Sequence, residues 1–456
     1  MVFNSNIFLF AFLPVVFGLF WLLKGRQARY VLLTVSGYVF YGYWDWRFCF
    51  LLLFSSLLSF YAALLIERSA SLRARRAWMT LSISADLTLL GFFKYYNFFA
   101  SSLHAAIPGI APPLLHIILP VGISFYTFHT MSYILDVAEG RIRATSNLFE
   151  YLTYVSLFSQ LVAGPIVRFR QIEQDLEHIE GPPREDFMAR GIGFFLVGLI
   201  KKAVVADSIA MYLDPALASY STLSTAGAWL AALGYTFQIY YDFSGYSDMA
   251  VGLGYLFGLH IPQNFNAPYR ALGPRDFWRR WHISLSTWLR DYLYIPLGGS
   301  RFGETRMMIN LLVTMLLGGL WHGANWTFVV WGAYHGMLLI VERVLDRWLT
   351  RVPTAMRRAG TFVLVVFSWV LFRSDSLDMA GQWMARMLGI GAGTQSAPPS
   401  LIVLVALCLV AVNTVPETWD IRFGIRYRWA PVYALGFLLA YLFVNGRHSV
   451  FLYYQF

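Results

Sequence analysis

The segment IFLFAFLPVVFGLFWLL (residues 7–23) establishes what kind of protein this is. It contains no charged residue, and no basic residue precedes it, as one would in a cleavable signal peptide. A membrane-spanning helix needs roughly 20 mostly apolar residues, so we expect this segment to cross a bilayer. Positive charges follow it directly, at Lys24, Arg26 and Arg29. Because cytoplasmic loops carry such charges, we place Met1 outside and this loop in the cytoplasm.

Apolar segments of this kind recur from one end of the chain to the other. Hydrophobic residues make up 58% of the 456 residues and charged residues only 13%, against about 25% charged residues in soluble domains. This composition excludes a water-soluble globular enzyme and any disordered or fibrous class. We predict an all-α polytopic membrane protein with about 11–12 transmembrane helices plus re-entrant and interfacial helices, forming a single domain over residues 1–456 with both ends outside. After residues 7–23, the predicted crossings are Tyr30–Tyr43, Phe48–Ile66, Trp78–Phe99, Leu115–Val137, Phe187–Leu213, Trp229–Ser247, Ile309–Trp321, Phe328–Val341, Phe362–Phe372, Leu401–Val412 and Val432–Val444.

One apolar segment, Phe149–Val167, does not fit a simple crossing. Basic residues flank it at Arg143 and Arg168, and it contains Gly164-Pro165. We expect a re-entrant or partly buried segment, since irregular backbone at membrane depth must be enclosed by protein or line a cavity. The longest weakly apolar region, residues 262–306, holds seven arginines and is placed on the cytoplasmic side. The net charge of +10 therefore belongs to orienting loops and does not indicate a nucleic-acid partner.

A histidine surrounded by glycine and tryptophan is the first candidate for chemistry. The segment GGLWHGANW (residues 318–326) carries His322 between two apolar segments. Ionisable residues within a membrane are costly and mark function by default, and an imidazole can take up and return a proton near neutral pH. The glycines allow other backbone or a substrate to approach closely. From position alone, a packing histidine bonded to a carbonyl is an equally good interpretation.

A second candidate is RDFWRRWHISLSTWLRDY (residues 275–292), which also contains a histidine, His282. At 100° per residue its aromatic side chains form one stripe of a helix, consisting of Phe277, Trp281, Trp288 and Tyr292. The arginines off this stripe are Arg279, Arg280 and Arg290. We expect an interfacial helix whose arginines face lipid headgroups or a phosphate-bearing ligand, with plain interfacial anchoring as the alternative.

Two carboxylates and several hydroxyls interrupt the apolar run at YYDFSGYSD (residues 240–248). In lipid, Asp242 and Asp248 would be very costly. They should line a polar cavity or satisfy the backbone of a broken helix, and we favour this structural role over catalysis. The two cysteines, Cys49 and Cys408, lie far apart and predict neither a metal site nor a disulfide framework.

The sequence closes with FLYYQF (residues 451–456), in which four residues are aromatic. An interfacial aromatic belt accounts for such a segment. Its phenols also offer hydroxyl groups that could accept an acyl group.

Together these motifs resemble the membrane-bound O-acyltransferases, over nearly the whole length of the chain. The chain is similar to the bacterial branch that contains the alginate O-acetyltransferase membrane subunit and the teichoic-acid D-alanylation membrane subunit. The matching motifs are MVFNSN (1–6), LPVGISFYTF (119–128), LVAGP (161–165), YDFSGYSDMA (241–250), the block 277–299 and LGGLWHGANW (317–326).

The resemblance implies a ring of helices thinned at its middle, where a cytoplasmic pocket and an outer funnel meet. His322 matches the family histidine taken as the catalytic base, and His282 lies forty residues upstream, where the family carries its second functional polar residue. The aromatic tail resembles a motif that the D-alanylation system carries on a separate one-helix subunit. Residues 430–456 would then be a fused final helix with its acyl-transfer motif. Tyr453 is the expected acyl acceptor and Tyr454 the alternative.

The resemblance also implies substrates and partners in a bacterial inner membrane, with no bound cofactor and no metal. An acyl thioester, acetyl-CoA or a carrier-protein conjugate, would dock from the cytoplasm with its phosphates near Arg275, Arg279, Arg280 or Arg290. The acyl group, acetyl with D-alanyl as the alternative, would pass through Tyr453 to a separate extracytoplasmic SGNH-like transferase or polysaccharide-modification complex. In a simpler variant the partner's serine attacks directly. The alginate subunit runs longer at this end, so cellulose, peptidoglycan or another exopolysaccharide is as open as alginate.

Two other classes of function remain open at this stage. A transporter of an acyl donor or of a lipid-linked sugar would also suit polar, broken segments in a membrane. A structural scaffold for a polysaccharide synthase would need no chemistry at His322. Acyl transfer by the purified protein separates the first alternative from an enzyme, and substitution of His322 separates the second.

Overall fold

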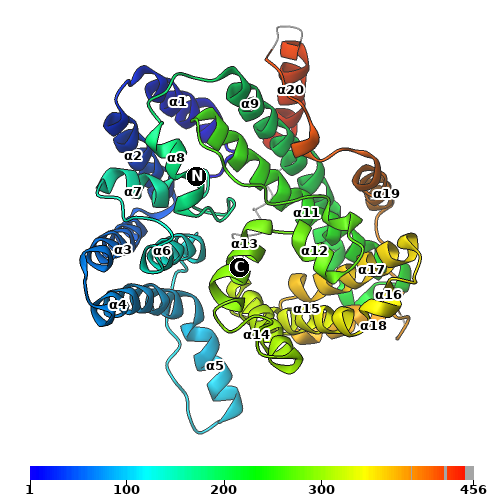
Figure 1. The fold of residues 1–456 in the computed structure, drawn as a ribbon. Coiled ribbons are helices and arrows are strands. Elements are labelled where there is room, and N and C mark those ends of the chain that lie inside the picture. The colour runs from blue at the N-terminus through cyan, green and yellow to red at the C-terminus, as the bar shows by residue number, and fades with distance from the viewer. Residues whose placement is uncertain (392, 426–428, 447–456) are drawn as a thin grey trace. The chain divides into compact units, whose positions relative to one another are not determined.

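The computed structural model describes residues 1–391, 393–425 and 429–446 (Figure 1). These residues form helices joined by loops and contain no β-strand, only one isolated bridge between Leu223 and Gln395. The predicted all-α class is confirmed. Two compact units can be distinguished: the described residues of the first lie within 1–196, 246–262, 423–425 and 429–431, and those of the second lie within 197–245, 263–391, 393–422 and 432–446.

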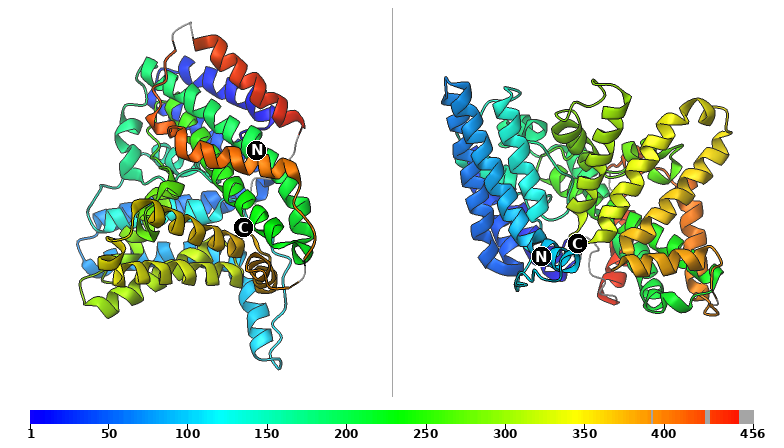
Figure 2. Two further views of the ribbon diagram at one scale, coloured as in Figure 1. Left: turned by 90° about the vertical axis from the view of Figure 1, so that its right-hand side faces the viewer. Right: turned by 90° about the horizontal axis from the view of Figure 1, so that it is seen from below.

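In the first unit, α3, α4 and α6 pack against one another and α2 packs against α7, as Figure 2 shows for α3, α4 and α6. The helical elements that lie within this unit are η1 (Phe8–Phe12), α1 (Leu13–Leu22), α2 (Arg26–Asp45), η2 (Trp46–Phe48), α3 (Cys49–Arg68), α4 (Leu72–Leu90), η3 (Gly91–Tyr95), α5 (Tyr96–Ala106), α6 (Ile123–Ala138), α7 (Leu148–Ser156) and α8 (Phe169–Glu177).

In the second unit, α14 and α15 form a helical hairpin, and α15 packs against α12 and α17. Its helical elements are η4 (Ile200–Ala206), α10 (Asp207–Ala218), η5 (Tyr220–Thr222), η6 (Pro268–Arg270), α12 (Pro274–Arg280), α13 (Ile283–Leu289), η7 (Arg290–Tyr294), α14 (Glu304–His322), α15 (Trp326–Val344), α16 (Asp346–Leu349), α17 (Thr354–Arg373), α18 (Leu377–Met387), α19 (Pro399–Thr414) and η8 (Thr418–Asp420). Three helices contain residues of both units: α9 (Glu185–Leu199), α11 (Thr225–Leu256) and α20 (Ala430–Gly446).

Each predicted crossing coincides with helix for at least part of its length. By length and composition, two helical segments of the described residues could span a membrane, Arg26–Arg68 and Thr354–Arg373. Shorter apolar helices cover Phe8–Leu22, Pro399–Thr414 and Ala430–Val444. The number of crossings, the outward orientation of both ends and the single domain stay predictions.

Two apolar segments contain less helix than a crossing would. The predicted crossing Leu115–Val137 is wrong in its first part, because the helix begins only at Ile123, after Pro120 and a left-handed Gly122 with φ of 77°. In the segment Phe149–Val167, α7 ends at Ser156 and buried irregular backbone follows. This short helix with enclosed loop is the arrangement expected for a segment that does not cross as one continuous helix.

The motif at residues 240–248 lies inside α11, an unbroken helix of 32 residues. The expected role in satisfying a broken helix is therefore wrong. Lys202 Nζ instead lies 2.6 Å from a carboxylate oxygen of Asp242 and 2.8 Å from one of Asp207. Each of the three side chains is at most 3% exposed. Ionic pairing makes these polar residues tolerable in an apolar helix pair.

The segment 275–292 is not the single helix that its aromatic stripe predicts. It divides into α12, α13 and η7, and the break falls at His282, whose φ of 44° is left-handed. The aromatic stripe is buried in spite of this break: Phe277 and Trp281 are each 1% exposed and Trp288 4%. These aromatic residues are buried as a group, but they do not form one stripe of a single helix, because the chain leaves helical geometry at Trp281 and His282.

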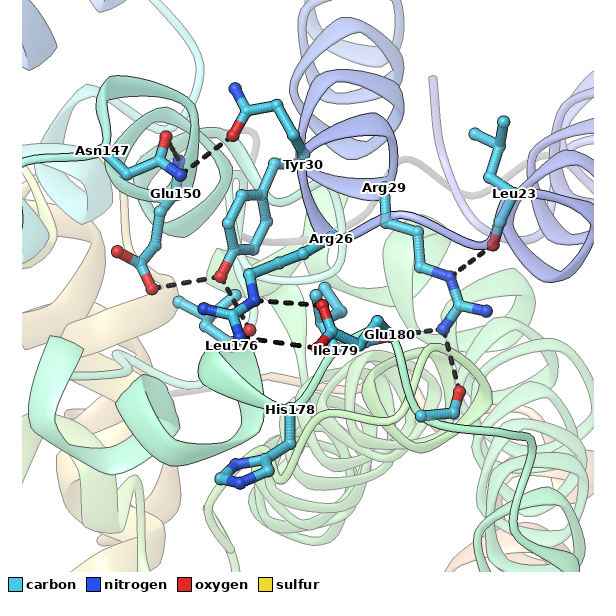
Figure 3. Close-up of polar contacts among 12 residues, drawn as sticks. Leu23, Arg26, Arg29, Tyr30, Asn147, Glu150, Leu176, His178, Ile179 and Glu180 are labelled. Carbon is cyan, nitrogen blue, oxygen red and sulfur yellow. Dashed lines mark hydrogen bonds and ion pairs between the residues drawn. The ribbon is translucent and has the colours of Figure 1, made fainter.

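The basic residues after the first apolar segment are largely engaged within the first unit (Figure 3). Arg29 is 3% exposed and donates to the carbonyl oxygens of Leu23 at 2.8 Å and Gly181 at 3.0 Å. Arg26 forms an ion pair with Glu180 at 3.1 Å. The residues after α8 are thus fastened to the start of α2 by two arginines.

Candidate active site

His322 is the last residue of α14 and is 4% exposed. The glycine-rich sequence before it lets α14 lie directly on α15: a Cβ on Gly319 would stand 2.2 Å from the carbonyl oxygen of Phe328, and one on Gly332 would stand 2.3 Å from that of Met315. No side chain fits at either place. These glycines therefore fix the hairpin whose turn follows His322.

His282 is fully buried and occupies the residue before α13. Asn264 holds this turn, because its Oδ1 lies 3.1 Å from His282 Nδ1 and accepts from the backbone N–H of Ser284 at 3.2 Å and from its hydroxyl at 2.8 Å. A left-handed backbone at a non-glycine residue is unfavourable, and this network compensates for it. The ring of Phe243, from α11, packs edge-on against the imidazole with a centroid distance of 4.7 Å.

The structure brings the two histidines together. Their ring centroids are 6.3 Å apart, although the residues are forty positions apart in the sequence. Aromatic rings surround His322: the centroid of Trp321 is 5.0 Å away, and those of Trp331 and Phe372 are each 5.2 Å away. Two imidazoles in such an apolar enclosure can exchange protons with a bound substrate while water is kept out.

A third histidine, which the sequence motifs did not indicate, lies next to this pair. His335, on α15, is 1% exposed and its Nδ1 lies 3.3 Å from Trp278 Nε1. Its ring centroid is 4.8 Å from that of Trp331, which also contacts His322. No motif surrounds His335. It follows Trp331 by four residues, however, and this spacing places both side chains on the same face of a helix.

Of the four arginines predicted to bind the donor, three are paired with carboxylates and one is exposed. Arg275 is paired with Glu342 at 3.5 Å and with Asp346. Arg280 is paired with Asp276 at 2.8 Å and Arg290 with Asp291 at 2.7 Å. The hydrogen bond with Asp291 raises the pKa of the Arg290 guanidinium above its ordinary value. The fourth predicted arginine, Arg279, is exposed.

The remaining candidates cannot be located in the same way. Tyr453 and Tyr454 lie outside the described residues, as does the rest of the aromatic tail, residues 451–456. Within the described part of the chain, no group of three or more histidine, cysteine or acidic side chains is arranged to hold a metal ion.

The fold and the site together define an all-α protein in which two buried histidines share an aromatic enclosure. The chain matches the membrane-bound O-acyltransferase family over residues 40–374. The chain belongs to the membrane-bound O-acyltransferase family, and it is therefore a membrane protein and an acyltransferase.

Relatives with three different names match this chain. A probable alginate O-acetylase of Azotobacter vinelandii is 47% identical over 405 residues, covering 87% of this chain and 80% of that protein. A peptidoglycan O-acetyltransferase of Helicobacter pylori is 35% identical over 423 residues, covering 86% of this chain and 80% of that protein. A teichoic acid D-alanyltransferase of Bacillus subtilis is 29% identical over 270 residues, covering 55% of this chain and 68% of that protein.

Proposed function

We propose that the protein moves an acetyl group from a cytoplasmic thioester donor to the outer side of a bacterial inner membrane, for O-acetylation of an extracytoplasmic polysaccharide. The placement of His282 and His322 side by side in an aromatic enclosure carries this proposal. The acetyl group is favoured because relatives at 47% and 35% identity are named O-acetylases or O-acetyltransferases, whereas the named D-alanyltransferase is 29% identical.

In the proposed reaction His322 is the general base. Its imidazole takes the proton of an attacking hydroxyl, whose oxygen forms a bond to the thioester carbonyl carbon. His282 stabilises the negative charge on the carbonyl oxygen of the tetrahedral intermediate. The intermediate then breaks its carbon–sulfur bond, and the proton held by His322 passes to the departing thiolate. The products are an oxygen ester and a free thiol.

The attacking hydroxyl is assigned to Tyr453, with Tyr454 as the alternative. The resulting tyrosyl ester would be discharged to a separate extracytoplasmic transferase of the SGNH type, which esterifies the sugar. Both chain ends then lie on the outer side, where Tyr453 can meet that partner. Alginate and peptidoglycan are the polymers that the relatives' names offer, and cellulose or another exopolysaccharide is equally compatible with this chemistry.

The base is tested by His322→Ala in purified protein supplied with radiolabelled acetyl-CoA. We expect acetyl transfer to fall by roughly 10²–10⁴-fold, the usual contribution of a general base, while membrane expression is retained. His335→Gln is the matched control, because His335 is equally buried in the same unit but is not one of the pair. Unchanged transfer in His322→Ala would overturn the assignment, and absence of transfer in the wild type would return the transporter to consideration.

The acceptor is tested by Tyr453→Phe beside Tyr454→Phe, followed by mass spectrometry of the C-terminal peptide after a brief reaction. We expect Tyr453→Phe to abolish the acetylated peptide, because phenylalanine lacks the nucleophilic oxygen. Loss of the adduct in Tyr454→Phe alone would move the acceptor by one residue. Full polymer acetylation in both variants would favour direct attack by the partner's serine.

A further inference from the structure

Three arginines of the second unit come from three different elements that pack together. Arg270 lies in η6, Arg280 ends α12 and Arg358 lies near the start of α17. Both α12 and α17 pack against η6. We call these three residues the arginine cluster. Only Arg280 belongs to the segment from which the sequence predicted donor binding.

The cluster has more positive charge than its carboxylate partners neutralise. Asp276 pairs with Arg280 at 2.8 Å. Arg270 donates to two neutral acceptors, the carbonyl oxygens of Val412 at 2.6 Å and Val415 at 2.8 Å. Because a carbonyl oxygen carries no net charge, the charge of Arg270 is not cancelled.

Among the three arginines, Arg358 has the fewest interactions that compensate its positive charge. Its Nη2 is buried and has no hydrogen-bond partner within the described residues. The charges of Arg270 and Arg280 repel its guanidinium. Like charges that lie near one another repel, and an anion bound at the cluster would relieve this repulsion and accept from the unused Nη2 of Arg358.

The helix that carries Arg358 adds to the positive potential. The first turn of α17 contains no acidic residue, and Arg357 and Arg358 follow closely. The N-terminus of a helix is itself partially positive and favours an anion. Guanidinium groups match the geometry of phosphate oxygens and bind them through paired hydrogen bonds. A phosphate group therefore fits the excess charge, the helix end and the unused donor of Arg358.

We propose that the arginine cluster Arg270, Arg280 and Arg358 is a phosphate-binding site on the cytoplasmic side of the protein. Two sources supply this chemistry: the phosphates of a coenzyme A donor, which rests on the proposed function, and the phosphate headgroup of an anionic lipid. In this proposal Arg275 does not bind the donor phosphates, because its guanidinium is already paired with Glu342 and Asp346.

The test compares two acetyl donors in nanodiscs, acetyl-CoA and the phosphate-free thioester acetyl-N-acetylcysteamine. For Arg358→Gln we expect the KM for acetyl-CoA to rise about tenfold with kcat nearly unchanged, which corresponds to the loss of one charged hydrogen-bonded contact. The kinetics with acetyl-N-acetylcysteamine should stay as in the wild type. Arg358→Lys should recover part of the loss, since it keeps the charge but not the paired donors. Arg351→Gln is the matched control, an exposed arginine beside the same helix.

A second arm varies the lipid, with nanodiscs of phosphatidylcholine alone or with phosphatidylglycerol added. If phosphatidylglycerol raises the unfolding temperature of the wild type but not of Arg358→Gln, and the KM for acetyl-CoA is unaltered, the bound phosphate belongs to a lipid. Equal KM values and equal lipid responses in the wild type and Arg358→Gln would overturn the phosphate site. That result is distinct from failure of the proposed function, in which the wild type transfers acetyl from neither donor.

Discussion

Two buried polar clusters of the second unit deal with burial in opposite ways. In one cluster, Lys202 forms ion pairs with Asp242 at 2.6 Å and with Asp207 at 2.8 Å, so that opposite charges compensate one another. His282 and His322 lie among aromatic rings and can each be neutral. Opposite charges in direct contact hold helices together but have little freedom to change protonation. A pair of imidazoles among aromatic rings holds the fold less firmly and is suited to moving protons.

The two clusters are physically joined through α11. Asp242 belongs to the ion cluster, and the next residue, Phe243, packs on the ring of His282. A Cβ on Gly245 would stand 2.7 Å from the carbonyl oxygen of Gly198, so the backbones are in direct contact here. The ion cluster therefore fixes the position of α11 on which one wall of the histidine site depends.

Replacing Lys202 should produce the largest loss of stability. Lys202→Met leaves two buried carboxylates without their shared cation, and breaking such a pair costs about 3–5 kcal/mol. Chemical unfolding of the purified protein in detergent measures this loss. Lys201→Met is the control, since Lys201 is only partly buried and donates to the hydroxyl of Thr418 at 2.9 Å. If both variants lost the same stability, the ion cluster would not be the structural element described.

Replacing Asn264 should produce a smaller loss of stability and a clear loss of activity. Asn264→Leu removes the acceptor shared by His282 and Ser284, and a buried donor left unsatisfied costs about 1–3 kcal/mol. The imidazole of His282 would also lose its fixed orientation. Unfolding and acetyl transfer are measured on the same preparation.

A second variant, Asn264→Asp, distinguishes an effect on the protonation of His282 from a loss of stability. It keeps an oxygen acceptor, so the fold should survive, but its negative charge favours the imidazolium form of His282. His282 then keeps its proton to a higher pH than in the wild type, so any limb of the pH profile of acetyl transfer that follows the protonation of His282 should move to higher pH. An identical pH profile in wild type and Asn264→Asp would show that acetyl transfer does not depend on the protonation of His282.

Much of the helical architecture can be predicted from the sequence, because long apolar segments in a membrane have few alternatives to helix. The candidate histidines can also be predicted, since His322 and His282 stand in unusual local sequence. Their proximity depends on a left-handed turn at His282 that Asn264 holds from eighteen residues away. Local pattern favours a continuous helix there, and only the folded chain supplies the contact that breaks it.

Charged residues were harder to predict for the same reason. The partner of Asp242 is Lys202, forty residues earlier, so periodicity within either helix gave no sign of it. Arg29 is one of the positive charges that predict the orientation of the chain, and nothing in the local sequence indicates that it is buried against the carbonyl oxygen of Gly181, which follows α8. Loop position predicts the side of the membrane on which an arginine lies, whereas its partners depend on the tertiary fold.

The smallest effect should come from His335, which tests where the histidine site ends. His335→Leu removes the acceptor of Trp278 Nε1, a single hydrogen bond worth about 0.5–1.5 kcal/mol. His335→Gln retains an acceptor and should lose less stability than His335→Leu. His335 contacts Trp331, which in turn contacts His322, and it has no role in the proposed reaction. Acetyl transfer in both variants should therefore stay within roughly threefold of the wild type, well short of the loss from removing a general base. If His335→Leu were instead as inactive as His322→Ala while still folded, the proton-active site would extend through Trp331 to a third histidine.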